Sequence, residues 1–423
     1  MTTLLKNGTI FTSHGLMQRD VFVSNGKVFV DSLDALTIQP ADSIVDCTNQ
    51  VIIPGFVDVH VHLREPGFFY KESIASGTAA AAKGGYTCVC PMPNLNPAPS
   101  TLDALRVQLD LIERDAKIKV IPYGTITAKQ DGRSQLADMD AMAPYVCGFS
   151  DDGKGIQTGD LMEEAMEKAK ALGKLIVAHC EDETLLYDGY IHQGNYAQAH
   201  NHRGICSESE WAQVARDVEL AAKTGCGYHV CHISTKETVN IIREAKASGV
   251  NVTCETGPHY LVLSDQDLQE DGRFKMNPPL RDISDRDALV KGIQDGTIDM
   301  IATDHAPHSQ EEKAKGLENS AFGIVGLETA FPVLYTSLVK TGVITLERLI
   351  HLMAIAPRER FGLPGGKIAD GEPADITIID LEESYTIDKD DFVSKGKATP
   401  FDGWQVQGRI VKTFVDGTIV WEK

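Results

Sequence analysis

The sequence predicts an α/β protein whose centre is a (β/α)8 TIM barrel, with a small β-sandwich domain formed by the two ends of the chain. Eight short apolar runs follow one another between residues 56 and 303, and segments with helical periodicity separate most of them. Eight parallel strands with helical crossovers in about 300 residues close into a barrel. An open, doubly wound sheet is the alternative, but no GxGxxG motif follows the first run.

The two ends of the chain have the pattern of short strands joined by tight turns. Asn25-Gly26 and Asp416-Gly417 each separate two apolar runs, which is a hairpin signal. Each end is short for a core of its own, so we expect one shared domain rather than two separate β appendages. The expected domain limits are 1–52 and 363–423 for the two parts of the β-sandwich and 53–362 for the barrel. The expected terminal strands are residues 9–12, 21–23, 28–30, 375–380, 411–415 and 418–421.

The apolar pattern also places the elements of the barrel. The expected strands are residues 56–61, 86–90, 119–123, 146–150, 175–179, 228–233, 251–255 and 299–303. The clearest helices are residues 160–172, 208–223, 236–248 and 284–294. Long irregular segments follow the fifth, seventh and eighth strands, at 182–207, 256–283 and 305–326. Loops of this length after the carboxyl ends of barrel strands usually carry function.

Composition narrows the class of protein. The 423 residues are 42% hydrophobic and 24% charged, as in a soluble globular protein. The net charge of -20 disfavours nucleic acid and anionic membrane surfaces as partners. No apolar run approaches the roughly 18 residues of a membrane helix, and the start lacks a signal-peptide pattern, so we expect a cytoplasmic protein without a membrane partner. The nine cysteines form no CxxC pair, which favours a reduced compartment over a disulfide scaffold.

Polar residues at the ends of the expected strands predict a metal site. His60 and His62 end the first strand, and alternation along a strand puts both imidazoles on the face that points into the barrel mouth. His179 and His232 end the fifth and sixth strands, and Asp304 ends the eighth. Barrel enzymes place their chemistry at this rim. Imidazole and carboxylate ligands suit zinc, so these residues predict a catalytic metal centre.

The fourth strand ends in Asp151-Asp152-Gly153, between the first and fifth strands around the barrel. A carboxylate here could bridge two metal ions about 3.5 to 4 Å apart. The same three residues are also good turn formers. The residues alone therefore leave both a bridging ligand and a solvated turn open.

Seven segments together carry a resemblance to a known family. They are residues 60–66 (HVHLREP), Met92-Pro93-Asn94, Ser150-Asp151-Asp152-Gly153, Ala178-His179-Cys180-Glu181, His229-Val230-Cys231-His232-Ile233-Ser234, Met276-Asn277-Pro278-Pro279 and residues 302–313. In this order they resemble the dihydroorotases of the amidohydrolase superfamily, in particular the bacterial type I branch. The resemblance covers essentially the whole chain, including the split β domain.

The resemblance implies an enzyme of de novo pyrimidine (UMP) biosynthesis. Its reaction is the reversible, zinc-dependent hydrolysis of the cyclic amide of L-dihydroorotate to N-carbamoyl-L-aspartate. The family pattern implies two zinc ions per chain, with His60, His62 and Asp304 on the first and His179 and His232 on the second.

The ligand that bridges the two ions is also implied by the resemblance. Many amidohydrolases use a carboxylated lysine at the end of the fourth strand, but no lysine stands at that place here. In the type I branch the second aspartate of the pair takes the bridge, which implies Asp152. Asp151 and, less directly, Lys154 stay as alternative bridges.

The expected mechanism follows from charge. Zinc ions lower the pKa of bound water and stabilise an oxyanion, so a metal-bridging hydroxide is expected to attack the ring amide carbonyl. Asp304 is expected to take the proton from this hydroxide and deliver it to the leaving ring nitrogen, as general base and then general acid.

Binding of the substrate carboxylate needs a second set of residues. Arg64 follows His62 by two residues and should lie on the same face, where a guanidinium grips a carboxylate with two donors. The resemblance adds Asn94 and His308 as carboxylate contacts, Asn277 as a ring contact, and the backbone of Phe322-Gly323. Plainer roles stay open, since Arg64 could pair with Glu65 and Asn94 could cap a turn.

Two other functions compete with this interpretation. Dihydropyrimidinases and allantoinases are cyclic amidases that share the His-x-His motif, but their neutral rings offer Arg64 no partner. A non-catalytic scaffold for aspartate transcarbamoylase is the second alternative, although this chain keeps every expected ligand. An active enzyme could still associate with the transcarbamoylase.

Several properties stay open at this point. A homodimer is the usual state of such an enzyme, and ligand type does not fix the identity of the metal. Residues 308–321 could form a mobile lid or a solvated loop. His229 precedes His232 by three residues and is expected on the opposite face of its strand. His259 and His305 are candidates for groups that orient the ligands.

Overall fold

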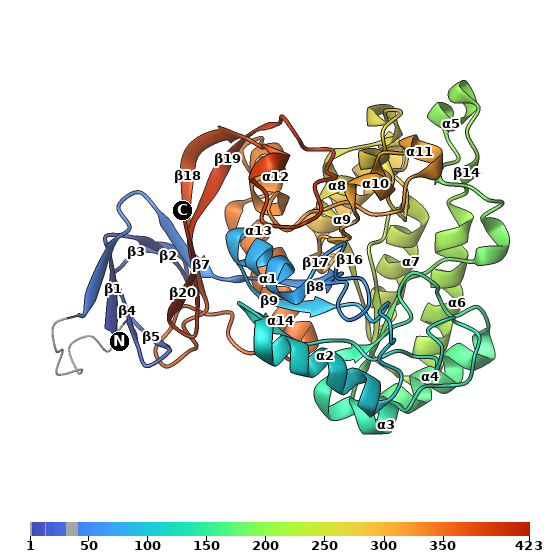
Figure 1. The fold of residues 1–423 in the computed structure, drawn as a ribbon, viewed down its shortest axis with the longest axis horizontal. Coiled ribbons are helices and arrows are strands. Elements are labelled where there is room, and N and C mark those ends of the chain that lie inside the picture. The colour runs from blue at the N-terminus through green and yellow to red at the C-terminus, as the bar shows by residue number, and fades with distance from the viewer. Residues whose placement is uncertain (1, 13, 31–40) are drawn as a thin grey trace.

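Eight parallel strands close into a barrel in this computed structural model, which describes residues 2–12, 14–30 and 41–423 (Figure 1). Hydrogen-bonded ladders join three of the strands in one group and five in another. Single parallel bridges, from Gly124 to Phe149 and from Val61 to His305, close the two remaining seams. All eight predicted strands are confirmed. They are β8 (Phe56–Val61), β9 (Tyr86–Pro91), β10 (Lys119–Val120), β11 (Gly148–Phe149), β12 (Leu175–Ala178), β15 (Tyr228–Val230), β16 (Val252–Thr256) and β17 (Met300–Ile301).

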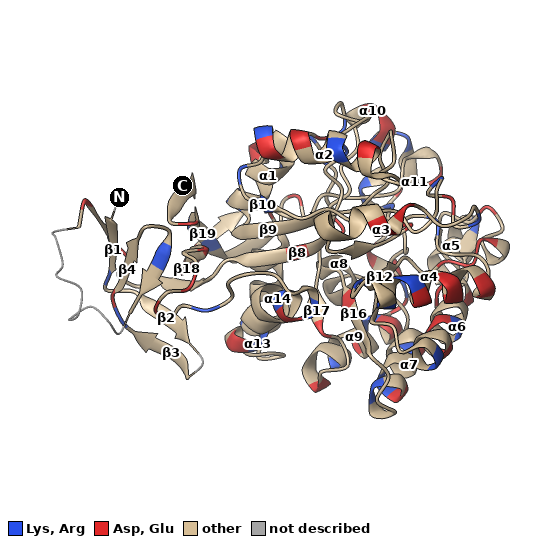
Figure 2. Ribbon diagram, turned by 90° about the horizontal axis from the view of Figure 1, so that it is seen from below, with Lys and Arg blue, Asp and Glu red and all other residues tan. Residues whose placement is uncertain are grey.

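Helices pack around the outside of this barrel (Figure 1). The four predicted helices, α4 (Gly159–Ala171), α6 (Glu208–Thr224), α7 (Lys236–Ala247) and α9 (Ile283–Asp295), begin and end within one residue of the expected limits. In α6, Val214, Val218 and Ala221 are buried on one face, as the helical period requires. Figure 2 shows positions of Asp and Glu along α4 and α6, in line with the negative net charge.

The remaining helices and loop strands complete the barrel domain. The helices are α1 (Ile74–Lys83), α2 (Leu102–Asp115), α3 (Met139–Met142), α5 (Asn195–His200), α8 (Pro258–Val262), α10 (Gln310–Lys313), α11 (Gly316–Asn319), α12 (Ala330–Leu334), α13 (Leu346–Ile350) and α14 (Ala356–Phe361). A short pair, β13 (Ile191–His192) and β14 (Gly204–Ile205), lies in the long segment after β12. Within the described ranges, no helix has both the length and the hydropathy that crossing a bilayer requires.

The inside of the barrel is filled with small apolar and sulfur-containing side chains. Val57 and Val59 from β8 pack there with Cys88 and Cys90 from β9, and Phe361 joins the same cluster from α14. All nine cysteines fall in the described ranges and are free thiols. The polar residues of the barrel mouth therefore rest on a dry and closely packed layer.

Two sheets built from both ends of the chain form the domain beside the barrel (Figure 1). One has the order β20-β19-β18-β7-β2-β3 and the other the order β5-β4-β1-β6. Leu5, Ile10, Ile378 and Phe414 belong to a single core cluster. This confirms the shared β-sandwich. The strands are β1 (Thr2–Lys6), β2 (Thr9–Thr12), β3 (Gly15–Gln18), β4 (Val21–Ser24), β5 (Lys27–Phe29), β6 (Ser43–Asp46), β7 (Val51–Pro54), β18 (Ile376–Thr386), β19 (Gln405–Val415) and β20 (Thr418–Glu422).

The predicted domain limits, 1–52, 53–362 and 363–423, stay a prediction. Strand β7 runs to Pro54 and belongs to the terminal sheet, so that sheet continues past residue 52. Residues 1, 13 and 31–40 of the first predicted segment lie outside the described residues.

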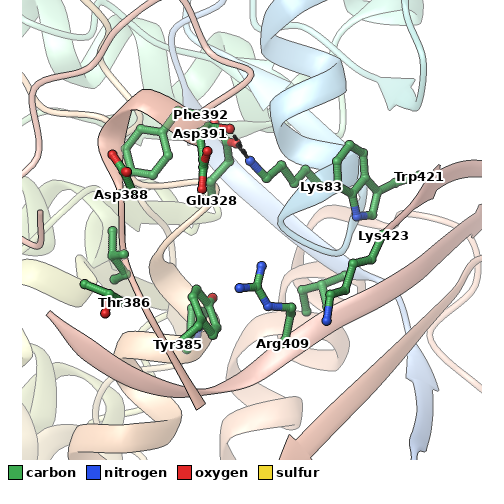
Figure 3. Close-up of a pocket in the computed structure, with 13 residues that line it drawn as sticks. Lys83, Glu328, Tyr385, Thr386, Asp388, Asp391, Phe392, Arg409, Trp421 and Lys423 are labelled. Atoms are coloured by element: carbon green, nitrogen blue, oxygen red, sulfur yellow. Dashed lines mark hydrogen bonds and ion pairs between the residues drawn. The ribbon is translucent and has the colours of Figure 1, made fainter. Parts of the chain in front are cut away.

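A cavity of about 270 Å³ lies where the terminal sheet meets the barrel, and we call it the sheet-side cavity (Figure 3). Its cations face their own carboxylates. The Nζ of Lys83, at the end of α1, lies 3.0 Å from an oxygen of Glu328. The Nε of Arg409 lies 2.8 Å from Glu383, and its guanidinium carbon lies 3.7 Å from the centre of the Tyr385 ring.

Candidate active site

The carboxyl ends of the barrel strands bring the six predicted metal ligands together at the barrel mouth. On one side, the Nε2 of His60 lies 3.3 Å from Oδ1 of Asp152 and 3.6 Å from Oδ1 of Asp304. The Nε2 of His62 lies 3.0 Å from the same Asp304 oxygen and 3.6 Å from Oδ2 of Asp152. This half of the cluster contains the ligands that the family pattern implies for the first ion.

The other half of the cluster is a pair of imidazoles. The Nδ1 of His179 and the Nε2 of His232 lie 2.9 Å apart. They lie 3.7 Å and 3.6 Å from Oδ1 of Asp152. Asp152 thus contacts both halves of the cluster, which is the position that a bridging ligand requires.

The central atoms lack partners of their own. His60 Nε2 and Asp152 Oδ1 are buried and form no hydrogen bond within the described residues. Burial would raise the pKa of Asp152, but attraction to His60 and close contacts from His232 and His60 together hold that pKa well below its usual value. Burial likewise opposes charge on His60, yet Asp152 raises its pKa well above the ordinary value. Buried nitrogen and carboxylate donors that converge in this way form a set that a divalent cation can satisfy.

Backbone conformation explains how ligands from several strands converge. His60 lies within β8, where a shift in the pairing register with β9 between Asp58 and Val61 interrupts the alternation set by Val57 and Val59. His232 and Asp304 instead follow the ends of β15 and β17, with φ angles of 32° and 47°. Left-handed backbone is uncommon outside glycine and concentrates at functional sites. At these two positions it interrupts the alternation of the strand just before the mouth.

The aspartate pair at the end of β11 divides into two roles. Asp152 enters the cluster, whereas Asp151 is fully engaged with the backbone. Its carboxylate accepts hydrogen bonds from three N–H groups of residues 126–132, at 2.8, 3.0 and 3.1 Å, and from the hydroxyl of Thr127. Lys154 is exposed. These contacts favour Asp152 as the bridge over both alternatives.

Arg64 lies beside the cluster without a carboxylate partner among the described residues. Its Nε donates to the carbonyl oxygen of Pro307 at 3.2 Å, and its Nη2 lies 3.2 Å from Nε2 of His308. The alternative partner Glu65 is engaged elsewhere, since it accepts a hydrogen bond of 2.9 Å from the N–H of Ile74. The guanidinium therefore keeps donors for an anionic ligand.

His308 is held neutral between two cations. Burial, together with Arg64 and Lys71, lowers the pKa of His308 to about 3. Its Nε2 lies 2.7 Å from the carbonyl oxygen of Phe322, so that nitrogen carries the proton and donates it. The Nδ1 then accepts from Lys71 Nζ at 3.2 Å. A protonated Nε2 is no acceptor for Arg64, which again leaves the guanidinium free for another partner.

The two predicted asparagines are used differently. The Oδ1 of Asn94 accepts from Nδ1 of His62 at 2.8 Å, and its Nδ2 donates to Oδ2 of Asp152 at 3.2 Å. Asn94 therefore orients two metal ligands in this structure. Asn277 donates to Oε2 of Glu181 at 2.6 Å, while its buried Oδ1 has no partner within the described residues. Asn277 thus keeps an acceptor for a ligand.

Hydrogen bonds to the backbone of Lys275 hold the segment after β17 in place. Gly323 N–H donates to the carbonyl oxygen of Lys275 at 3.0 Å, so this backbone group of the predicted Phe322-Gly323 pair is already occupied. Lys313 is buried, and its Nζ donates to the carbonyl oxygens of Lys275 and Ala321 at 3.0 and 2.7 Å. Residues 308–321 contain α10 and α11 and are more than a solvated loop.

Sequence reasoning missed two buried residues beneath the metal ligands. Oε1 of Glu255 lies 2.9 Å from Nδ1 of His60, and its Oε2 lies 3.1 Å from Nε2 of His229. Burial would raise the pKa of Glu255, but hydrogen bonds from His229 and His60 lower it to about 2. The expectation that His229 faces away from His232 is wrong, because the left-handed backbone at His232 breaks the alternation. Polar residues within otherwise apolar strands were the available signal.

The two histidines proposed to orient ligands differ as well. His259 is buried, its Nε2 has no partner within the described residues, and burial lowers its pKa to about 4. His305 accepts from the N–H of Gly326 at 3.2 Å and lies 3.5 Å from Glu72. Neither imidazole hydrogen-bonds a predicted metal ligand within the described residues, although the backbone carbonyl of His305 accepts from the N–H of His62 at 2.8 Å.

A cavity of about 210 Å³, which we call the barrel-mouth cavity, opens over the cluster. All the predicted site residues except His60, which lies behind the others, line it. Its lining is His62, Arg64, Asn94, Asp152, Gly153, His179, His232, Asn277, Asp304, Ala306, His308, Phe322 and Gly323. A TIM barrel with a histidine and aspartate cluster at the carboxyl ends of its strands defines the class of metal-dependent barrel hydrolases.

Comparison with known proteins gives the family. A family model described as dihydro-orotase-like matches residues 49–238. Two relatives named dihydroorotase, from Geobacillus sp. (strain WCH70) and Bacillus caldolyticus, are each 50% identical and cover 100% of this chain and 99% of their own length. The chain therefore belongs to the dihydroorotase family, hydrolases of cyclic amides.

Solved structures confirm the fold. The L-hydantoinase (dihydropyrimidinase) from Arthrobacter aurescens matches with a TM-score of 0.88 at 27% identity, over 100% of this chain and 96% of that one. The dihydropyrimidinase from Brevibacillus agri NCHU1002 matches with a TM-score of 0.87 at 24% identity, over 100% and 95%. Both share the barrel and the terminal sheet domain with this chain.

Proposed function

We propose that the barrel-mouth cavity opens and closes the ring of L-dihydroorotate, interconverting it with N-carbamoyl-L-aspartate. The observation that carries this proposal is the position of Arg64. Its guanidinium lines the same cavity as the histidine and aspartate cluster and has no carboxylate partner among the described residues. A ring that carries a carboxylate supplies that partner while its amide reaches the cluster.

Two zinc ions are the proposed cofactor. His60, His62 and Asp304 would hold one, His179 and His232 the other, with Asp152 between them. Ions bound there supply a water of lowered pKa and polarise the amide carbonyl. The partnerless His60 Nε2 and Asp152 Oδ1 support this assignment.

Asp304 is the proposed proton carrier. Burial would raise its pKa, but the hydrogen bond from His62 and attraction to His60 lower it to about 2, so the carboxylate is ionised at neutral pH. Oδ1 faces His62, which leaves Oδ2 to take a proton from the attacking water. Delivery of that proton to the ring nitrogen completes cleavage of the carbon–nitrogen bond. In ring closure the same oxygen takes the proton from the nitrogen.

The remaining residues orient the substrate. Arg64 is proposed to bind the carboxylate with two N–H donors, and His308 and Asn94 to border the same subsite. Asn277 would accept a ring N–H through its free Oδ1. The Gly323 N–H is already bound to Lys275, so a backbone contact from this pair would come from Phe322 N–H.

A neutral cyclic amide is the second candidate substrate, since the solved L-hydantoinase (dihydropyrimidinase) shares the fold. It would leave the Arg64 guanidinium unpaired, which disfavours it. A homodimer in the cytoplasm and association with aspartate transcarbamoylase complete the proposal and do not alter the chemistry of the cavity.

Metal removal and reconstitution test the proposed function. The purified protein should open L-dihydroorotate, lose that activity on treatment with a chelator, and regain it when zinc is added back. Bound zinc should approach two ions per chain as activity returns. Turnover that survives complete removal of metal would contradict the proposal.

A further inference from the structure

A chain of buried polar groups runs beneath the metal ligands, from β8 across the barrel interior to β16 and β15. His60 Nδ1 lies 2.9 Å from Oε1 of Glu255, and His229 Nε2 lies 3.1 Å from Oε2 of the same carboxylate. Behind it, His229 Nδ1 lies 2.8 Å from the hydroxyl oxygen of Thr253. Exposed fractions of 1%, 1% and 0% for His60, Glu255 and His229 exclude water from the two contacts of Glu255, whereas Thr253 at the far end is half-buried.

Strand geometry puts these groups on one line. Thr253 and Glu255 lie two residues apart on β16 and share its inward face. His229 on β15 pairs directly with Thr253 in the parallel register. The carboxylate then reaches across the barrel interior to β8, which is not a neighbour of β16 in the ladders. A side chain that only filled the core would not need two imidazole partners on two strands.

Each atom in this chain of contacts has a single consistent role. A carboxylate accepts, so both imidazoles must present an N–H to Glu255. His60 then carries a proton on Nδ1, so Nε2, which faces Asp152, is the nitrogen that would bind a metal ion. His229 carries its proton on Nε2, and its Nδ1 accepts the hydroxyl hydrogen of Thr253. These donors and acceptors together fix which ring nitrogen of His60 and of His229 faces Glu255 with a proton.

We propose that Glu255 is a positioning residue that holds the ring and the tautomer of His60 for metal binding, and that His229 and Thr253 hold Glu255 in turn. This rests on the proposed function only in taking His60 as a metal ligand. Carboxylates that accept from the second nitrogen of a liganding histidine orient the ring and strengthen the ligand. Here three residues, Glu255, His229 and Thr253, support the ring of His60 in sequence.

The direct test is the zinc affinity of the metal-free protein, measured in competition with a chelating dye. Glu255→Gln keeps the size of the side chain but turns one acceptor into an NH2 group. One imidazole must then face a donor, which favours the His60 tautomer that cannot bind metal through Nε2. We expect zinc affinity to fall about 10- to 100-fold. Thr253→Val should lower it less, and Thr253→Ser, which retains the hydroxyl, should recover the wild-type value.

Asp217→Asn is the matched control. Asp217 is another fully buried carboxylate, which accepts from Tyr228 at 2.9 Å and lies 2.7 Å from Arg216, away from the cluster. Thermal unfolding of the metal-free variants reports folding separately from binding. The control should change unfolding but leave zinc affinity unaltered. If Glu255→Gln fails to fold, the Thr253 pair carries the test.

The outcomes separate this inference from the proposed function. Wild-type zinc affinity in a folded Glu255→Gln protein, or equal losses in Glu255→Gln and Asp217→Asn, would overturn the positioning role even if dihydroorotate is turned over. Weaker zinc binding confined to the Glu255 and Thr253→Val variants would support it even if the wild-type protein failed to open dihydroorotate. Thr253→Ser behaving like Thr253→Val would also overturn it.

Discussion

The sheet-side cavity and the barrel-mouth cavity are similar in size but differ in how their polar groups are satisfied. The sheet-side cavity holds about 270 Å³ and the barrel-mouth cavity about 210 Å³. In the first, Lys83 lies against Glu328 (Figure 3), and Arg409 pairs with Glu383. At the second, Asp152 Oδ1, His179 Nε2 and Asn277 Oδ1 have no hydrogen-bond partner within the described residues, and Arg64 has no carboxylate beside it there. Volume therefore does not distinguish the two cavities.

The difference shows what marks a functional site physically. A buried polar group without a partner costs about 1 to 3 kcal/mol, so a fold retains several of them together only where a ligand completes them. In the sheet-side cavity Lys83 and Arg409 already have carboxylate partners, so a ligand is not needed to pair them. Six substitutions at five residues test whether this distinction decides function.

The largest loss is expected at the proton carrier. Asp304→Asn keeps the shape of the side chain but removes the base, so the rate of dihydroorotate ring opening should fall about 10²- to 10⁴-fold. Initial rates on zinc-loaded protein measure this. Because Asp304 is also a proposed ligand, bound zinc is counted on the same sample, and rates are compared per metal-loaded site. A rate within the wild-type range would exclude Asp304 from proton transfer.

Substitutions at Asp152 and Asp151 should affect different properties, namely zinc content and the free energy of unfolding. Asp152→Ala should lose at least one zinc ion per chain, because Asp152 contacts both halves of the cluster. Asp151→Ala should instead lower the free energy of unfolding by about 3 kcal/mol, because three backbone N–H groups lose their acceptor. Metal analysis and chemical denaturation distinguish them. Loss of zinc in Asp151→Ala with a normal stability would move the bridge to Asp151.

Removal of the guanidinium should affect substrate binding and leave the metal in place. Arg64→Ala is expected to lower kcat/KM for dihydroorotate by about 2 to 4 kcal/mol in transition-state free energy. Zinc content should stay at the wild-type level. Arg64→Lys should recover only part of the loss, since an ammonium lacks the two-pronged geometry. Normal turnover by Arg64→Ala would remove the carboxylate assignment.

The smallest effect is expected in the sheet-side cavity. Arg409→Met removes a partly exposed ion pair, and such pairs contribute about 0 to 1 kcal/mol to stability. Ring opening and zinc content should not change, and denaturation should show a shift within that range. A large loss of activity in this variant would mean that the paired cavity also serves the reaction.

Much of the barrel and its ligands could be predicted from the sequence. Apolar runs set the eight strands, and the polar residues that follow them, such as His179 and Asp304, belong at the rim by topology. Local conformation was harder to foresee. The left-handed backbone at His232 turns that residue toward the inner face, where His229 also lies, against the expected alternation. Asp151 and Asp152 differ in role because backbone N–H groups of residues 126–132 bind the carboxylate of Asp151. The residues next to the aspartate pair in the sequence do not predict this contact.

The most direct test of the account is the relative kcat/KM of the purified, zinc-loaded protein for L-dihydroorotate, dihydrouracil and allantoin. The unpartnered Arg64 predicts that dihydroorotate, the ring with a carboxylate, is opened efficiently and the two neutral rings are not. Efficient opening of dihydrouracil or allantoin, with dihydroorotate left intact, would contradict the central claim that the unmet groups of the barrel mouth are built for an anionic ring.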